Sequence, residues 1–572
     1  MDSPAIRALW AEAVRNEPFL EYVDLDKPID VIVAVDEQGF ADLAKANGPR
    51  SSSIHVGVAV GLTQFNDAMF QGSPFKLQPD GSYADKQCVA SAAVGPAPGR
   101  LVCGDGDDAK RLSPYMTQAL PLKKWSEAPF FAEFHLAGFR PLVAGAVGQA
   151  REKLPELLKD VPPPMAGLAE QGVAMLDDML TEASLWSDGM HSLTMSAYSG
   201  EAGAADVSFA FHMDNDRPFL AEALMRAQKR VTGPPKRFFD LPGDAKEGGF
   251  YHGLRTADVA HIQNPIVELW DGASRLALSM QVPMVKPMVE GGDLLVRSKC
   301  WQGENIVWAG GRLPGATKNA DAKVQPANVI WNDYVGWVVM GAPKSAQCGE
   351  LVSDSIDWAL RMKSLPKLKQ LSSEMDGITF SPIKSPLGQQ LRGYRLSVKK
   401  ELLNEATSDE RFAAAEGPLE ISLLIMDRGD TTWIGVSSDQ KLLESKLSSL
   451  GTGATLKGRS DVARVVVSQA LTAQFDSIDR LLALVEDLVP ESRKPISQVP
   501  SGIRTVPFVT EVSVKPGGRG SGANAMTMSW QVRVPPPVMA GLRKIADWTE
   551  SDYKRMKEVF AGSDAVKVLE KK

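Results

Sequence analysis

The histidines of this chain are the residues best suited to metal binding or acid–base chemistry, but their spacing matches no common motif. Neither HExxH nor HxxEH, the signatures of zinc peptidases, occurs in the sequence. His252 and His261 flank the segment GLRTADVA without a metal-ligand spacing. His55, His135 and His212 fall on expected strands or strand ends, where a hydrogen-bonded structural histidine is the usual occupant. The sequence therefore predicts no metal site.

No nucleophile or phosphate-binding loop stands out either. G-x-S-x-G is absent, and the S-x-x-K matches that begin at Ser364, Ser397 and Ser438 lack the companion S-D-N and K-T-G motifs. The segment GGRGSG at 517–522 has no G-K-[ST] ending and joins two expected strands, unlike a phosphate loop. We predict no catalytic and no cofactor-binding residues.

The four cysteines are Cys88, Cys103, Cys300 and Cys348. Cys88 and Cys103 lie on two expected antiparallel strands around the turn GPAPG, where facing Cα atoms are about 4.5–5.5 Å apart, within disulfide range. Both are missing from a similar segment later in the chain, as expected of a bonded pair. Cys300 and Cys348 are then left to pair with each other. The alternative is four buried thiols, because free cysteine is a common core residue. No CxxC is present, which argues against structural zinc.

Tryptophans are concentrated in one part of the chain, since six of the twelve lie between residues 270 and 358. Trp301, Trp308, Trp331 and Trp337 fall in strand-like segments. They could line a groove for an apolar or carbohydrate ligand, because aromatic rings supply contact area and orientation. The alternative is a tryptophan-rich core beneath a sheet.

Composition limits the class of protein. A chain of 572 residues suggests two to four domains. The net charge of −7 is spread along the chain without a basic run, which argues against nucleic acid as a partner. No window of 18 apolar residues is present, so we expect no transmembrane segment. The N-terminus does not have the pattern of a signal peptide, which leaves a cytoplasmic protein or a chain whose signal was removed. Disulfides favour the second, with a periplasmic, outer-membrane-associated or secreted location.

The order of expected elements indicates an α+β fold with an internal duplication. Residues 88–120 predict a strand, a turn, a second strand and a helix, and residues 420–450 predict the same series. Two later hairpins, at 191–213 and 509–534, also correspond in order. We predict two similar domains, each with antiparallel hairpins packed against helices. The expected domains are residues 1–265 and 331–572, joined by a strand-rich bridging segment at 266–330.

Two segments carry a family resemblance. RLVCGDGDDAKRL at 100–112 and the loop Leu241-Pro-Gly-Asp-Ala resemble those of a group of bacterial extracytoplasmic α+β proteins, many of which have lipoprotein signals. The group has no established activity. The resemblance implies an envelope location and a lipid anchor on the native N-terminus.

These observations favour a non-enzymatic envelope protein that binds or scaffolds, with an envelope protein or an apolar or carbohydrate ligand as its partner. The alternative is a hydrolase whose active site is dispersed along the sequence, and a cytoplasmic structural protein remains if the thiols are free. Converging carboxylates with displaced pKa values would favour the enzyme. A contiguous exposed apolar surface would favour binding.

Overall fold

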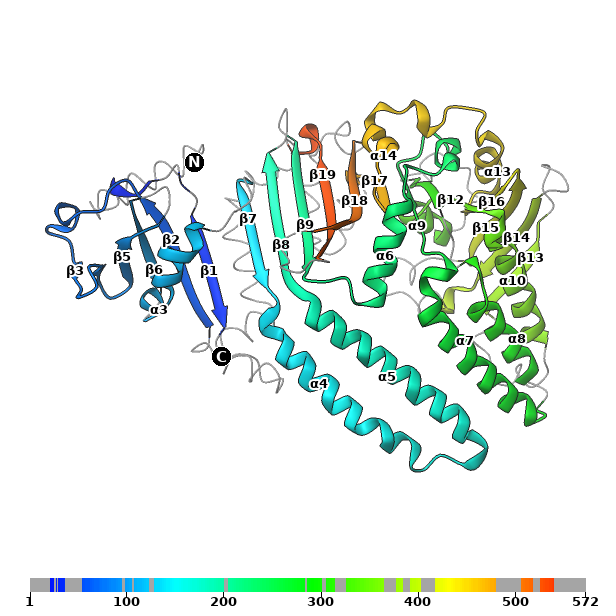
Figure 1. Ribbon diagram of the computed structural model, residues 1–572. Helices are drawn as coiled ribbons and strands as arrows, with labels where there is room; N and C mark the ends of the chain where they lie inside the picture. Colours follow the sequence, from blue (N-terminus) through cyan, green and yellow to red (C-terminus); the bar gives the residue numbers. More distant parts are fainter. Residues whose placement is uncertain are drawn as a thin grey trace. The chain divides into compact units, whose positions relative to one another are not determined.

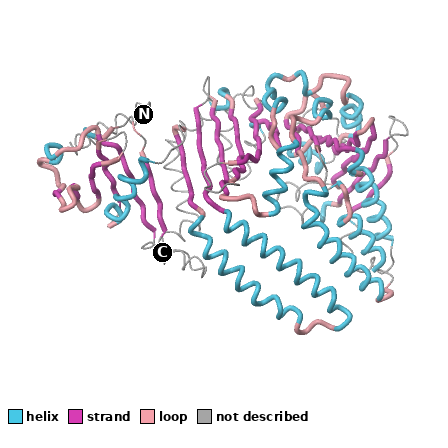
Figure 2. The backbone as a smooth tube through the Cα atoms, viewed as in Figure 1, coloured by secondary structure: helices cyan, strands magenta, loops and turns pink. Residues whose placement is uncertain are grey.

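The computed structural model of the chain forms two compact units, Met1–Glu127 and Ala128–Lys572. Each unit is built on an antiparallel sheet with helices, so the predicted α+β class is confirmed (Figures 1 and 2). The described residues are 21–24, 27, 29–35, 54–94, 98–104, 107–122, 128–199, 204–282, 285–300, 305–313, 326–364, 377–383, 391–402, 417–479, 506–517 and 525–539.

Six described strands form the sheet of the first unit, in the order β1-β2-β6-β5-β4-β3. The strands are β1 (Asp30–Val35), β2 (Ile54–Leu62), β3 (Lys76–Leu77), β4 (Tyr83–Ala84), β5 (Cys88–Ala92) and β6 (Gly99–Gly104). Helix α3 (Asp108–Pro114) follows β6, as the sequence predicts. One face of the sheet packs on a cluster that includes Met116 and Leu120, and the other packs on a cluster that includes Phe70 and Phe75.

Thirteen described strands form the sheet of the second unit, in the order β13-β14-β15-β16-β12-β11-β10-β17-β18-β19-β9-β8-β7. The strands are β7 (Phe130–His135), β8 (Met190–Ser199), β9 (Ala205–Met213), β10 (Glu247–Tyr251), β11 (Ile306–Gly311), β12 (Trp337–Pro343), β13 (Ile378–Pro382), β14 (Leu391–Val398), β15 (Leu419–Arg428), β16 (Thr431–Ser437), β17 (Thr472–Ser477), β18 (Pro507–Pro516) and β19 (Met526–Val534). The predicted hairpins at 191–213 and 509–534 are confirmed as β8–β9 and β18–β19.

Helices of the second unit pack on this sheet and on one another. They are α4 (Arg140–Lys153), α5 (Ala166–Gly189), α6 (Phe219–Arg230), α7 (Thr256–Ser279), α8 (Val285–Val296), α9 (Pro326–Tyr334), α10 (Cys348–Ser364), α13 (Gln440–Ser449) and α14 (Ala463–Val467). Figure 1 shows α4 and α5 as an antiparallel pair that extends from the ends of β7 and β8. None of the helices within the described ranges is long and apolar enough to cross a membrane.

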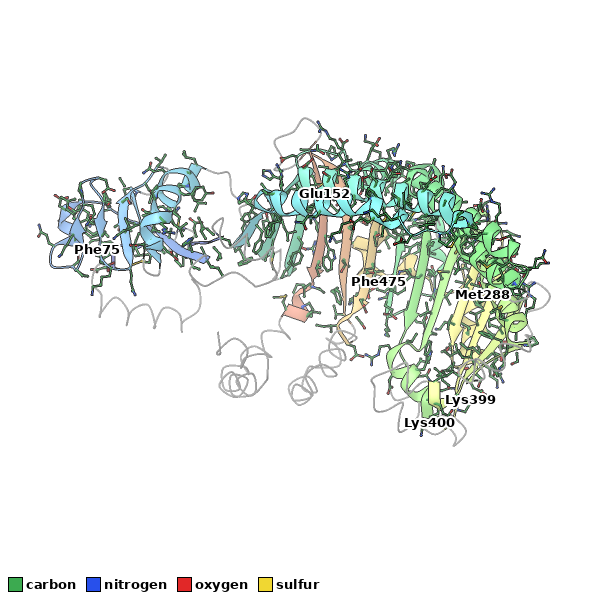
Figure 3. The ribbon with its side chains drawn as sticks, turned by 90° about the horizontal axis from the view of Figure 1, so that it is seen from below. Phe75, Glu152, Met288, Lys399, Lys400 and Phe475 are labelled. Atoms are coloured by element: carbon green, nitrogen blue, oxygen red, sulfur yellow. A yellow bond between two sulfur atoms is a disulfide. The ribbon has the colours of Figure 1, made fainter. Side chains whose placement is uncertain are left out.

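The main core of the second unit lies at the middle of the sheet, where strands that are distant in sequence pair with each other. β10 pairs with β11 on one side and with β17 on the other, which joins residues 247–251 to 472–477. Phe250 and Phe475 are almost completely buried there, together with Phe238 and Trp337. Phe475 is marked in Figure 3. Pairing over this distance in sequence makes residues 128–572 one unit.

The segment 266–330 is expected to be rich in strands, but three of its apolar pieces are helical. VELW and most of RLALSMQV lie in α7, and DLLV lies in α8. Short apolar runs do not distinguish a strand from a buried helix, and here α7 packs between α5 and α8. NIVWAGG is a strand as predicted, β11. Strands from residues 130–534 share one sheet, so the two compact units do not follow the expected boundaries at 265 and 330.

The duplication is not shown by the fold. In the first unit, β2 pairs with β6, the second strand of the hairpin β5–β6, and β4 pairs with β5. In the second unit, β14 pairs with β15, the first strand of the hairpin β15–β16, and β12 pairs with β16. The two hairpins therefore have the same local order but different neighbours.

Candidate metal centre

One group of side chains brings two histidines and a carboxylate together. A donor atom from each of Glu133, His135 and His191 lies within 4.8 Å of the other two. Oε2 of Glu133 is 3.7 Å from Nε2 of His135. The imidazole rings of His135 and His191 meet edge to face, with their centres 6.2 Å apart. This donor set is of the kind that binds zinc and other transition metals.

The register of two strands creates this group. Glu133 and His135 are two residues apart on β7, so their side chains share one face of the sheet. β8 pairs with β7 so that His135 faces Ser192, which places His191 beside it. His191 also occupies a bulge in the β8–β9 pairing, between Met190 and Ser192. Bulges redirect side chains and are common next to functional sites.

A second layer of polar contacts orients His191. Its Nδ1 lies 3.1 Å from Oδ1 of Asp214, whose Oδ2 accepts a hydrogen bond of 2.8 Å from Arg140. Arg140 also donates to the carbonyl of Met190, and Leu136 N donates to the carbonyl of His191 at 2.9 Å. A histidine held by a carboxylate through one nitrogen is the usual arrangement of a metal ligand that binds through the other.

Burial differs among the three side chains. The side chain of Glu133 is 5% exposed, that of His191 27% and that of His135 51%. The carboxylate is thus held in a partly desolvated position, while His135 stands at the surface. The group is reachable from solvent through His135.

Two other histidines have the structural role that the sequence predicts. His212 is buried between the hydroxyls of Thr194 and Thr527, each 2.9 Å from a ring nitrogen. His55 bonds through Nδ1 to Asp108 at 2.7 Å. The sequence predicts no metal site because the histidines are not close together along the chain. Strand pairing nevertheless brings His135 and His191 together. The only local signal was Glu133-x-His135 on a predicted strand.

Both predicted disulfides are confirmed. Cys88 and Cys103 face each other across β5 and β6 and are bonded. Cys300 is bonded to Cys348, at the start of α10. Two disulfides are typical of proteins that fold in an oxidising compartment outside the cytoplasm.

The structure does not bring the predicted tryptophan groove together. Trp308 and Trp337 lie on opposite faces of the sheet, because Trp308 pairs with Met340 whereas Trp337 pairs with Gly311. Trp337 is in the main core. Trp331 lies on α9, not on a strand, and donates through Nε1 to the carbonyl of Gly336. Trp301 lies outside the described residues.

A different surface of the second unit is apolar and open. Paired residues on β7, β8, β9 and β19 point to the same side of the sheet, and in three successive rows of this pairing the residues on one side are all apolar. We call this the apolar face. Its members are Phe130, Ala132, Phe134, Leu193, Met195, Ala197, Val207, Phe209, Phe211, Met528, Trp530 and Val532.

Burial on these strands is the reverse of the usual pattern. On the apolar face, Phe134 is 61% exposed, Phe130 50%, Trp530 49% and Leu193 38%. The opposite face carries Ser192, Thr194, His212 and Ser529, all of which are less than a tenth exposed. Helix α6 and Trp186 of α5 pack against the end of the apolar face that holds Phe211 and Met528. In Figure 1 no described helix crosses β7, β8 and β9 on the side where α6 lies.

One carboxyl group in the described ranges has a strongly displaced pKa. Burial raises the pKa of Asp476, on β17, to about 6, and Arg312 and the amide of Ser477 offset only part of this effect. Its Oδ1 has no hydrogen-bond partner among the residues that the structure describes. The carboxylate is therefore a destabilising group at neutral pH.

We expect Asp476→Asn to stabilise the protein at neutral pH but not in acid. The unfolded chain loses this proton near pH 3.8 and the folded chain near 6. The folded state therefore binds more protons in that interval, and stability falls as pH rises through it. Allowing for partial exposure, the gain at about pH 7.5 should be about 1–2 kcal/mol, and it should vanish near pH 4. Urea unfolding of both proteins at the two pH values measures it. An equal gain in the free energy of unfolding at both pH values would show that the charge of Asp476 is not the cause.

Comparison with family models, curated proteins and solved structures finds no match to this chain. The resemblance to bacterial extracytoplasmic proteins thus rests only on the two segments that carry it, and the site must be interpreted from its own geometry.

Proposed function

We propose that this chain is a non-enzymatic binding protein of the bacterial envelope, and that its apolar face is where a partner protein docks. The observation that carries the proposal is the exposure of Phe130, Phe134, Leu193 and Trp530 on one side of the sheet. Contiguous exposed apolar surfaces of this kind mark interaction sites in proteins. The two disulfides support a compartment outside the cytoplasm.

The chemistry of the face favours a protein over a small ligand. None of its twelve residues has a charged side chain or a hydroxyl, so it offers little to orient a carbohydrate. Phe134 and Phe130 stand half or more exposed at its edge, whereas a small apolar ligand is normally enclosed on most sides. Aromatic residues such as Phe209 and Trp530, whose rings are 5.6 Å apart, are enriched in the centres of protein interfaces.

The alternative, a hydrolase, would call for several carboxylates with displaced pKa values in one place. Among the described carboxyl groups whose pKa departs from its ordinary value, only that of Asp476 is raised. Asp476 lies on β17 beside Arg312, in a structural position. Binding is therefore the better-supported function.

Photo-crosslinking in the native host tests the proposal. Benzoylphenylalanine would be placed at Phe134 or at Trp530 of the full chain. As a matched control it would replace Met179, which is 61% exposed on α5. We expect positions 134 and 530 to give an adduct with the same envelope polypeptide, and position 179 to give none. Trp530→Glu should abolish the adduct from position 134, because a buried unpaired charge is costly at an interface.

Other outcomes would overturn the proposal. Adducts with lipid alone from positions 134 and 530 would make the face a lipid-binding surface. Equal labelling from position 179 would make the contact non-specific. The intact mass of the same protein, alkylated at lysis, should lack four protons relative to the reduced chain. The mass of the fully reduced chain would contradict the disulfides and therefore the proposed envelope location.

A further inference from the structure

We infer that Glu133, His135 and His191 form a binding site for a divalent transition metal ion, with Zn²⁺ as the representative ligand. This inference is independent of the proposed partner, because the three side chains lie on the side of the sheet opposite the apolar face. Two imidazoles and one carboxylate make up a common zinc ligand set, with a fourth position left for water.

The ligand types select the class of metal. Imidazole nitrogen suits zinc, copper, nickel and iron, whereas calcium and magnesium prefer sites built from oxygen atoms alone. With a single carboxylate, the site has too few oxygen ligands for either of the latter. We therefore expect Zn²⁺ to bind and Mg²⁺ not to compete.

The geometry is close to that of a bound ion. Donor atoms in a tetrahedral zinc site are about 3.4 Å apart. Oε2 of Glu133 and Nε2 of His135 are 3.7 Å apart, which is close to this separation. All three donor atoms lie within 4.8 Å of one another. A side-chain shift of about 1 Å would complete the site, and the half-exposed His135 can make it.

Asp214 is a positioning residue in this account. It contacts His191 through Oδ1 and Arg140 through Oδ2, and it does not belong to the three-residue group. Replacing such a carboxylate in known sites lowers metal affinity by about 10- to 100-fold. A purely structural role for Asp214 would change stability without this change in affinity.

The test is a titration of the metal-depleted full chain, without an affinity tag, with Zn²⁺ alone. Calorimetry and competition with a chromophoric chelator give stoichiometry and affinity, and Co²⁺ gives a visible spectrum that reports the ligands. We expect one ion per chain. His191→Ala and Glu133→Gln should each reduce affinity by about 100-fold or more, and Asp214→Asn by about 10- to 100-fold.

His261→Ala is the matched control, since His261 lies on α7 and is not in the group. It should bind Zn²⁺ as the unsubstituted chain does. Thermal unfolding of each metal-free variant separates loss of the site from loss of the fold, and Glu133→Gln keeps the side-chain shape if an alanine variant fails to fold. Absence of one-to-one binding in the unsubstituted chain, or unchanged affinity in His191→Ala, would overturn the inference.

Discussion

Replacing both Cys300 and Cys348 by alanine should lower the free energy of unfolding of the Ala128–Lys572 unit by about 4 kcal/mol. The bond closes a loop of 48 residues, and removing it restores the conformational entropy of that loop in the unfolded chain. Alanine is the appropriate replacement because Cys348 is completely buried, and a serine hydroxyl there would add its own desolvation cost. Denaturant unfolding, followed by tryptophan fluorescence, measures the change.

The other disulfide provides the control. Cys88 and Cys103 close a loop of 15 residues in the first unit, and their replacement by alanine should cost about 3 kcal/mol. Because the chain forms two compact units, each pair of substitutions should shift only the transition of its own unit. A change below about 1 kcal/mol for Cys300/Cys348, or a shift of both transitions together, would contradict this account.

The first disulfide could be predicted because its determinants are local. Cys88 and Cys103 flank a short turn, and the register of a hairpin follows from its own sequence. The bond between Cys300 and Cys348 followed only by elimination. This bond requires the start of α10 to lie next to Cys300, which follows α8, and no short-range sequence pattern predicts that contact.

The candidate metal centre was missed for the same reason. Glu133 and His135 are neighbours on one strand, but His191 follows two helices and joins them only through the β7–β8 register and a bulge. Neither feature can be derived from the spacing of histidines in the sequence. The apolar face was not predicted either, although residues 191–213 were expected to form a hairpin of two strands. Alternation shows that two faces differ but does not show which one is buried.

Phe475→Ala should destabilise the second unit by about 4 kcal/mol. Phe475 has no exposed surface and belongs to β17, which pairs with β10 on one side and β18 on the other. Its ring lies against Gly248, where an added Cβ would be 3.1 Å from the ring, and the guanidinium of Arg459 sits 5.1 Å from its centre. Truncation would remove these contacts and leave a cavity where the two halves of the sheet meet.

Phe475→Leu and Phe130→Ala are the controls for the size and the burial of the removed side chain. Leucine fills most of the volume and should cost only about 1–2 kcal/mol. Phe130 is also on a strand of this sheet but is 50% exposed, so Phe130→Ala should cost less than about 1 kcal/mol. Equal losses for Phe130→Ala and Phe475→Ala, measured by denaturant unfolding, would mean that the apolar face is covered in the free protein. That result would count against the partner site as well as against the position of the core, because an interface for a partner must be exposed before the partner binds.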